Sequence, residues 1–136
     1  MMDDRNPMGQ DTARRYAAAE MTGIERERLL MLLLDGGGRF LRLAREALAA
    51  GDVAGFGQAL ARAQAIIAEL QGTLDHEAGG EIALNLHRLY DFMLFHLTEA
   101  NGQGSVRHLD EVIATYETIT DAFRQVLEPV RPSVDG

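Results

Sequence analysis

The sequence predicts an all-α protein, an antiparallel four-helix bundle with a flexible or short-helical N-terminal leader. Apolar residues recur at the three- and four-residue spacing of one helix face in four long segments. The segments are separated by short stretches rich in glycine, aspartate and asparagine, and helices joined by a few residues lie antiparallel. We therefore expect a leader over residues 1–21, a helical bundle over 22–128 and a C-terminal tail over 129–136.

The first helix is predicted over residues 23–50. Thr22 stands three residues before Glu25 and ahead of an apolar run, which is the pattern of a capping box. The run at 29–34, "LLMLLL", covers nearly the full circumference of a helix, so we expect this helix to be wedged between two neighbours. The glycines at 36–38 predict a kink or a close approach of another backbone, and close packing is the favoured alternative.

The second helix is predicted over residues 53–74, after a stop at Gly51 and an N-cap at Asp52. One face carries its large apolar residues: Phe56, Leu60, Ala63, Ile67, Leu70 and Leu74. The segment 75–80 is predicted to be a tight connection to the next helix.

The third helix, residues 79–101, carries two apolar faces. The broad one is predicted to enter the core and contains Ile82, Leu86, Leu89, Tyr90, Met93, Leu97 and Ala100. On the far side, Leu84, Phe92 and Phe95 are interleaved with charged residues. We expect these three to form an accessory docking surface, and the alternative, that the leader or the end of the fourth helix covers them, stays open.

The fourth helix is predicted to follow the break at 101–105, with Ser105 as its cap and Pro129 and Pro132 after its end. Its face is narrow, as a bundle requires, and contains Leu109, Val112, Ile113, Tyr116, Ile119, Phe123, Val126 and Leu127.

Composition excludes several classes of protein. The 136 residues carry a net charge of −8, which argues against nucleic-acid binding. The longest apolar run has six residues, so membrane insertion is not expected, and the absence of cysteine fits a cytoplasmic protein. Residues 1–74 carry 10 acids and 9 arginines, but residues 75–121 carry 9 acids and 2 arginines. The acidic half either steers a basic partner or serves solubility alone.

The sequence offers no recognisable catalytic arrangement. There is no lysine, which removes Schiff-base chemistry and the P-loop lysine. The four histidines form neither a Glu-x-x-His pair nor an HExxH motif, so we expect no metal and no cofactor. Ser105 and Ser133, the only serines, lack a nucleophile-elbow setting, and the protein is predicted not to be an enzyme.

Three segments carry a resemblance to a known family. "AQAIIAELQGTLDHEAGGEIALNLHRLYDFM" (63–93), "LTEAN" (97–101) and "LDEV" (109–112) match its signature in order and spacing. Over roughly residues 16–127 the chain resembles the flagellin-specific export chaperone family, FliS.

The resemblance implies a small cytosolic helical bundle that binds the disordered C-terminal region of flagellin. Members keep that region from polymerising and help present it to the flagellar export gate, without ATP or a cofactor. The resemblance and the two faces of the third helix together predict the partner-binding residues: Tyr16, Ile66, Ile67, Leu70, Leu74, Ile82, Leu84, Asn85, Leu89, Tyr90, Phe92, Met93 and Phe95. Two alternatives remain, a homo-oligomeric interaction or adaptor protein without a flagellin client, and an enzyme or metal-carrying bundle.

Overall fold

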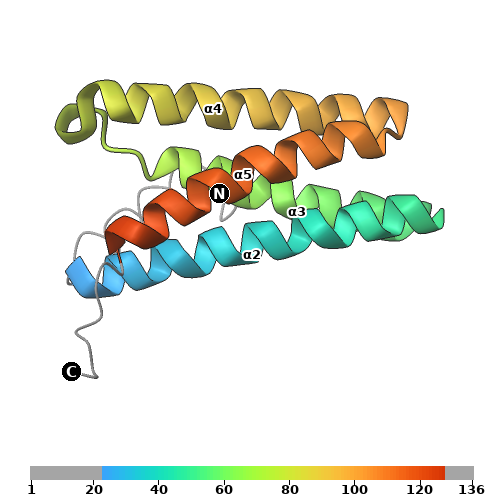
Figure 1. Cartoon of the computed structure of the whole chain (residues 1–136), viewed down its shortest axis with the longest axis horizontal. Coiled ribbons are helices and arrows are strands. Elements are labelled where there is room, and N and C mark those ends of the chain that lie inside the picture. The colour runs from blue at the N-terminus through green and yellow to red at the C-terminus, as the bar shows by residue number, and fades with distance from the viewer. Residues whose placement is uncertain (1–22, 128–136) are drawn as a thin grey trace, which may run out of the picture. The chain divides into compact units, whose positions relative to one another are not determined.

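The computed structural model describes residues 23–127, which form four helices joined by short connections. In chain order these are α2 (Gly23–Ala50), α3 (Val53–Gly72), α4 (His76–Gln103) and α5 (Val106–Leu127) (Figure 1). No strand occurs within this range, and the predicted all-α four-helix fold is confirmed. The chain divides into two compact units, residues 1–30 and 31–136. The first includes only the opening turns of α2 among the described residues, so the bundle below is that of residues 31–127.

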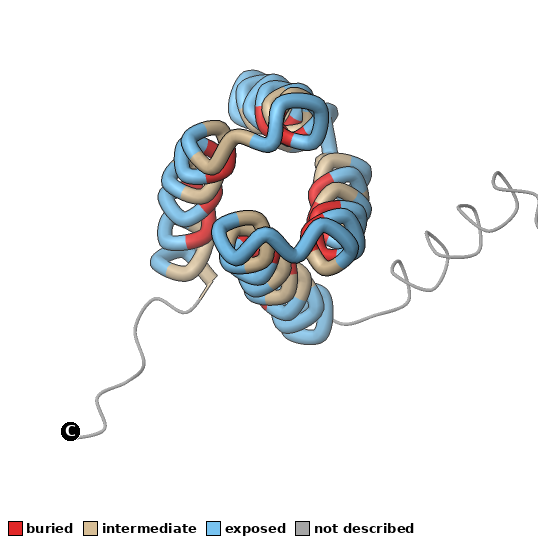
Figure 2. The backbone as a smooth tube through the Cα atoms, turned by 90° about the vertical axis from the view of Figure 1, so that its right-hand side faces the viewer, coloured by how far each residue is buried: buried red, intermediate tan, exposed pale blue. Residues whose placement is uncertain are grey.

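The core of the bundle is built from one stripe on each helix, and Figure 2 shows the buried positions on the inner side of the four tubes. On α3 and α4 the stripe follows an alternating three- and four-residue spacing. Its buried members are Phe56, Leu60, Ala63, Ile67 and Leu70 on α3, and Ala83, Tyr90, Met93, Leu97 and Ala100 on α4. This spacing lets side chains of antiparallel helices interdigitate at a shallow crossing angle.

Two residues assigned by sequence to the core face of α4 lie outside the core. Ile82 is 72% exposed and Leu89 is also exposed, whereas Ala83 is buried. The buried residues Ala83, Tyr90 and Leu97 of α4 lie seven positions apart. Ala83 therefore faces the core, and Ile82 lies at the edge of the buried stripe. The backbone at Gly80 adds to the shift, because its φ of 52° and ψ of −124° interrupt the helix just before Ile82.

Gly51, Asp52 and Ser105 act as predicted, but the boundary between the second and third helices differs. α3 ends at Gly72 rather than at residue 74, and the segment 75–80, predicted to be a connection, instead begins α4 at His76 with Asp75 as its N-cap. Gly51 has a φ of 78°, and the Asp52 carboxylate accepts a 3.0 Å hydrogen bond from the Gly55 N–H. Ser105 Oγ accepts from the His108 N–H at 3.3 Å. The break after α4 comes at Gly104, with a φ of 63°, because α4 extends to Gln103. Thr22 lies outside the described residues.

The glycine triplet of α2 lies in an unbroken helix. A Cβ at Gly37 would overlap the ring and hydroxyl of Tyr116 on α5, and the Tyr116 hydroxyl donates a 2.7 Å hydrogen bond to the Leu34 carbonyl. The close-approach alternative is therefore correct, although the group that approaches is a tyrosine side chain rather than a backbone. Within the apolar run of α2, Met31 and Leu34 enter the core while Leu32 is exposed, so the neighbours of α2 do not cover the whole run.

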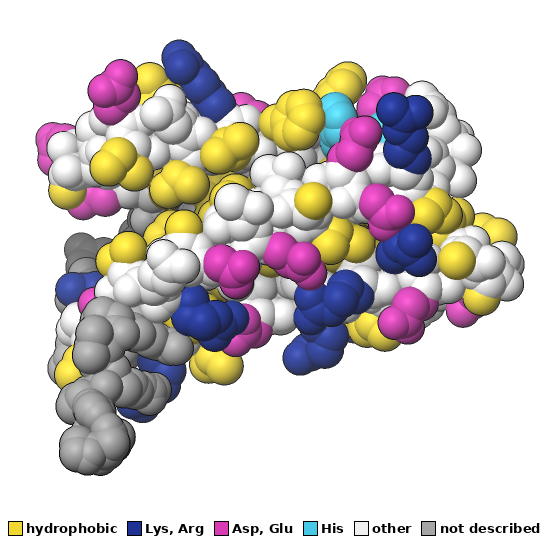
Figure 3. All heavy atoms as spheres, in the orientation of Figure 1, with side chains coloured by type: hydrophobic (Ala, Val, Ile, Leu, Met, Phe, Trp, Pro, Cys, Tyr) yellow, Lys and Arg dark blue, Asp and Glu magenta, His cyan; other side chains and the backbone are white. Residues whose placement is uncertain are grey.

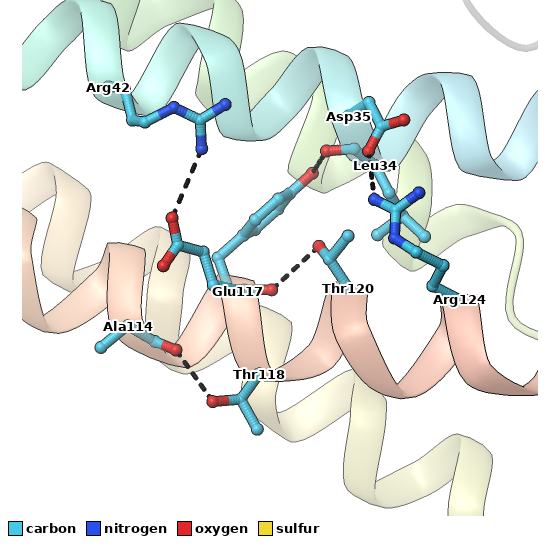
Figure 4. Close-up of polar contacts among 9 residues, drawn as sticks. Leu34, Asp35, Arg42, Ala114, Glu117, Thr118, Thr120 and Arg124 are labelled. Atoms are coloured by element: carbon cyan, nitrogen blue, oxygen red, sulfur yellow. Dashed lines mark hydrogen bonds and ion pairs between the residues drawn. The ribbon is translucent and has the colours of Figure 1, made fainter.

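Ion pairs between α2 and α5 close the bundle on one side, and we call their six residues the α2–α5 seam. The N–O distances are 3.4 Å for Arg42–Glu117, 2.6 Å for Arg45–Asp110 and 2.8 Å for Arg124–Asp35. Figure 4 shows the first and third of these pairs between the two helices. The seam side chains are roughly half exposed, so each pair contributes less than about 1 kcal/mol to stability.

Candidate partner-binding surface

The predicted partner-binding residues differ in how far the structure buries them. Four are fully buried in the bundle core: Ile67, Leu70, Tyr90 and Met93. Such side chains support the surface but do not reach a partner unless the bundle opens. Ile66 and Leu74 are half-buried and Asn85 is exposed, whereas Tyr16 lies outside the described residues.

A glutamine fixes how α4 lies on α3. Gln71 Nε2 donates to the His87 carbonyl at 3.1 Å and to Asp91 Oδ1 at 2.8 Å. The Asp91 carboxylate also lies 3.5 Å from His87 Nε2. These contacts hold one edge of α4 against α3, so the opposite edge of α4 faces α5 and the remaining face points outward.

The edge of α4 toward α5 carries exposed apolar side chains near the start of the helix. His96 marks this edge, because its Nε2 lies 3.7 Å from Glu111 Oε1 on α5 and its ring centroid lies 5.6 Å from that of His108. Leu89 and Ile82 precede His96 by seven and fourteen residues, which places them on the same edge.

The end of α5 supplies further apolar residues opposite this edge. Phe123 is half-buried and Val126 is 72% exposed, although sequence placed both on the core face of α5. Figure 1 shows the reason, since α4 and α5 diverge toward the beginning of α4 and the end of α5. Leu86, which sequence also placed on the core face of α4, is half-buried. We call Ile82, Leu86, Leu89, Phe123 and Val126 the α4–α5 patch, and Figure 3 shows hydrophobic side chains at this opening.

The outward face of α4 carries a second apolar group, which we call the α4 ridge: Leu84, Phe92 and Phe95. All three are exposed, with Phe92 at 45% and Phe95 at 61%. The Phe92 ring packs on His96, with centroids 4.1 Å apart and a tilt of 38°. The prediction that these residues lie outside the core is confirmed. Within residues 23–127 nothing buries them, and the described part of α5 is therefore not their cover.

Sequence reasoning did not include α5 in the binding surface. Val126 fits the core stripe of its helix by spacing, and the divergence that exposes it is a property of two helices together. A partial signal was present in the sequence, because Pro129 follows Val126 by three residues and a proline marks where a helix is expected to end.

The described residues show no grouping suited to a metal. Among residues 23–127 no three histidine, aspartate or glutamate side chains are placed to hold an ion. Burial raises the pKa of Tyr90 to about 12 and raises that of Tyr116 further, so both phenols stay neutral and serve packing. None of the described helices combines the length and the apolar character needed to cross a bilayer.

Exposed apolar groups beside an intact core are typical of a binding surface. Comparison with known proteins gives the particular family. Residues 8–130 match the model of the flagellar protein FliS. This chain belongs to the FliS family.

Several relatives that match most of this chain are flagellar secretion chaperones. The flagellar secretion chaperone FliS of Salmonella typhimurium is 40% identical over 99 residues, which span 72% of this chain and 73% of that protein. The flagellar secretion chaperone FliSB of Pseudomonas aeruginosa is 40% identical over 96 residues, 71% of this chain and 76% of the relative. The FliS of Vibrio cholerae is 32% identical over 108 residues, 79% of each chain. The resemblance identified from the sequence is therefore confirmed, and the family is one of chaperones.

Proposed function

We propose that this protein is a cytoplasmic export chaperone that binds the disordered C-terminal region of flagellin. Binding keeps that region from polymerising before export and presents it to the flagellar export apparatus. The observation that carries the proposal is the exposure of the α4–α5 patch and the α4 ridge on a chain of the FliS family.

The arrangement of the two apolar groups supports a wrapping client. The α4 residues of the α4–α5 patch lie on the edge of α4 next to the face that carries the α4 ridge, so a client segment that follows the surface of α4 contacts both groups. A disordered chain that orders on binding can cover such a broad, shallow surface because its shape is set by the contacts it makes.

The entropy cost of ordering the client also favours its release. The client loses conformational entropy when it orders on the chaperone, and this cost lowers the affinity per unit of buried area. A complex held by surface apolar contacts therefore comes apart without ATP, since the chaperone core need not unfold. Beneath the outer face of α4, the side chains of Tyr90 and Met93 are fully buried. They keep this face rigid while clients exchange.

Titration with a flagellin C-terminal segment tests the proposal. We expect one client segment to bind one chaperone, with a negative heat-capacity change from apolar burial. An Ile82→Ala/Val126→Ala variant should bind about tenfold more weakly, and the full-length chaperone should slow filament growth from flagellin monomers. Val53→Ala is the matched control, because Val53 is exposed at the start of α3, the opposite end of the bundle from Ile82.

The absence of calorimetric binding would contradict the proposal, as would equal loss of affinity in the control. The expectation that Tyr16 contributes to the site stays a prediction, and a Tyr16→Ala variant in the same titration checks it.

Self-association is the second candidate, because the exposed phenylalanines of the α4 ridge could also pair between copies. Light scattering on the purified chain distinguishes the two. A dimer that persists in the presence of flagellin would favour a homo-oligomeric adaptor, and a monomer that forms a one-to-one complex would favour the chaperone.

A further inference from the structure

Two arginines share one aromatic ring on the side of the bundle that α2 and α3 form. The guanidinium carbon of Arg39 on α2 lies 5.4 Å from the centroid of the Phe40 ring, and that of Arg62 on α3 lies 5.7 Å from it. Both arginines are exposed, and Phe40 is half-buried. Cation–π attraction holds each guanidinium near the ring, so two positive charges from different helices stay close together.

The acids around these two arginines do not neutralise them. Among residues 23–127 no carboxylate lies within ion-pair distance of Arg39 or Arg62. The surrounding acids are Asp35 and Glu46 on α2, Glu69 on α3, and Glu117 and Asp121 on α5. Asp35 and Glu117 are already paired with arginines of the α2–α5 seam. The two guanidiniums therefore create a local positive potential that attracts carboxylates, although the whole chain carries a net charge of −8.

Exposed leucines flank Arg39 on the outer side of α2. Leu32 is 64% exposed and Leu43 is 44% exposed. The two are eleven residues apart, which is about three turns and about 16 Å along the axis. Arg39 lies between them, within about 40° of each around the helix. The outer side of α2 therefore presents apolar, basic and apolar side chains along one line.

Gly36 lies near the same line, between Leu32 and Arg39. Contact with Tyr116 explains the glycine at 37, but no such contact exists at Gly36. A Cβ there would meet only Ile66 Cδ1 of α3, at 3.7 Å, which is ordinary van der Waals contact. Glycine weakens a helix relative to alanine, and packing among the described residues does not require it at this position. Its missing side chain leaves room for another chain to approach α2.

We infer that this surface docks an acidic amphipathic helix of a second protein, distinct from the flagellin client. We call it the α2–α3 face, and its residues are Leu32, Gly36, Arg39, Phe40, Leu43 and Arg62. A helix laid along α2 places its carboxylates near the two arginines and its apolar residues on the two leucines, while the glycine lets its backbone come close. A second copy of the chain is a poorer occupant, because two chains of net charge −8 repel each other.

Two synthetic peptides test the charge selectivity of the α2–α3 face. Each carries two leucines three helical turns apart, with glutamates between them in one peptide and glutamines in the other. We expect the glutamate peptide to bind the full-length chain about tenfold more tightly, with a difference that shrinks as salt is added. Arg62→Glu should remove this preference, whereas Arg88→Glu, the same charge change on α4, should preserve it. Equal binding of the two peptides, or equal effects of the two variants, would overturn the inference.

A larger side chain at Gly36 tests where the helix lies. Gly36→Gln should melt no earlier than the unmodified chain, because its Cβ makes only an ordinary contact, yet it should bind the glutamate peptide about tenfold more weakly. Gly57→Gln is the matched control, because a Cβ at Gly57 meets no atom within 4 Å, and it should leave the affinity unchanged. Equal affinity of the two glycine variants would overturn the inference.

A saturating flagellin C-terminal segment distinguishes a second protein from the client. We expect the glutamate peptide to bind with unchanged affinity in its presence, since the α2–α3 face lies on other helices than the α4–α5 patch and the α4 ridge. Displacement of the peptide would make the client the occupant and overturn the inference. If the chain does not bind flagellin, the proposed function fails, but the peptide titrations still decide this inference. A dimer that Arg62→Glu converts to a monomer would identify a second copy as the occupant and also overturn it.

Discussion

The α2–α5 seam and the outer face of α4 are both surfaces of the same bundle, yet their side chains have different partners. At the seam, arginines of α2 and α5 meet acids on the opposite helix, and Tyr116 donates to the α2 backbone. On the outer face of α4, phenylalanines are exposed and Arg88 is unpaired among the described residues. The comparison indicates that contacts closed within the chain hold the fold, whereas contacts left open on α4 are available to another chain.

The largest expected difference in stability is between a substitution in the core beneath α4 and a substitution on the exposed face of α4. Leu97 is fully buried, so Leu97→Ala should lower the free energy of unfolding by about 2–5 kcal/mol. Phe95→Ala, two residues away and on the exposed ridge, should lower it by less than about 0.5 kcal/mol. Urea denaturation measures both, and equal losses would show that the ridge belongs to the core.

A smaller loss is expected at the glycine that accommodates Tyr116. Gly37→Ala places a Cβ within the Tyr116 ring, and the forced shift of α5 should cost about 2 kcal/mol. Gly57→Ala is the matched control, because its Cβ meets no atom within 4 Å and alanine favours a helix over glycine by about 0.5–1 kcal/mol. If both variants gain stability, Tyr116 does not need the space above Gly37.

Removing the Tyr116 hydroxyl should cost about 1 kcal/mol, the usual net value of one hydrogen bond. Burial raises the pKa of Tyr116 above its ordinary value of 10.0. The unfolded chain therefore loses this proton first as the pH rises, and stability present below pH 10 declines above it.

Tyr116→Phe should accordingly reduce the slope of stability against pH above pH 10 by up to about 1.4 kcal/mol per pH unit. Tyr90, whose pKa rises to about 12, should account for part of the remaining slope. An unchanged slope would show that Tyr116 ionises freely in the folded protein.

The smallest effect is expected at the exposed ion pairs of the seam. Asp110→Asn leaves Arg45 without its carboxylate partner, and the loss should stay below about 1 kcal/mol and shrink as salt is added. Thermal melts at low and high salt measure it. A loss above about 2 kcal/mol would mean that these pairs, rather than Tyr116 and the core, hold α2 against α5.

Much of the fold could be predicted from the sequence because its signals are local. The stop at Gly51 and the caps at Asp52 and Ser105 depend on residues within a few positions of each other. The glycine triplet favours close packing over a kink, but the sequence does not identify the group that approaches, because Tyr116 is about eighty positions away.

Only part of the candidate site could be predicted, because helical spacing is also a local signal. Helical spacing was sufficient to separate Phe92 and Phe95 from the core face of α4. Spacing also placed Ile82 and Val126 in the core, because a stripe of apolar residues does not reveal where two helices diverge. Which residues of an apolar stripe are exposed depends on the position of the neighbouring helix, and the residue spacing along one helix does not give that position.

We expect Tyr116 and the buried core to hold the fold and the α4 side to bind the client. Two-dimensional NMR of the labelled chain, titrated with a flagellin C-terminal segment, tests it residue by residue. We expect the largest chemical-shift changes at the side chains and amides of Ile82, Leu89, Phe92, Phe95 and Val126, with small changes at Arg42, Arg45 and Asp110. Changes concentrated at the seam, with the α4 side unaffected, would contradict it.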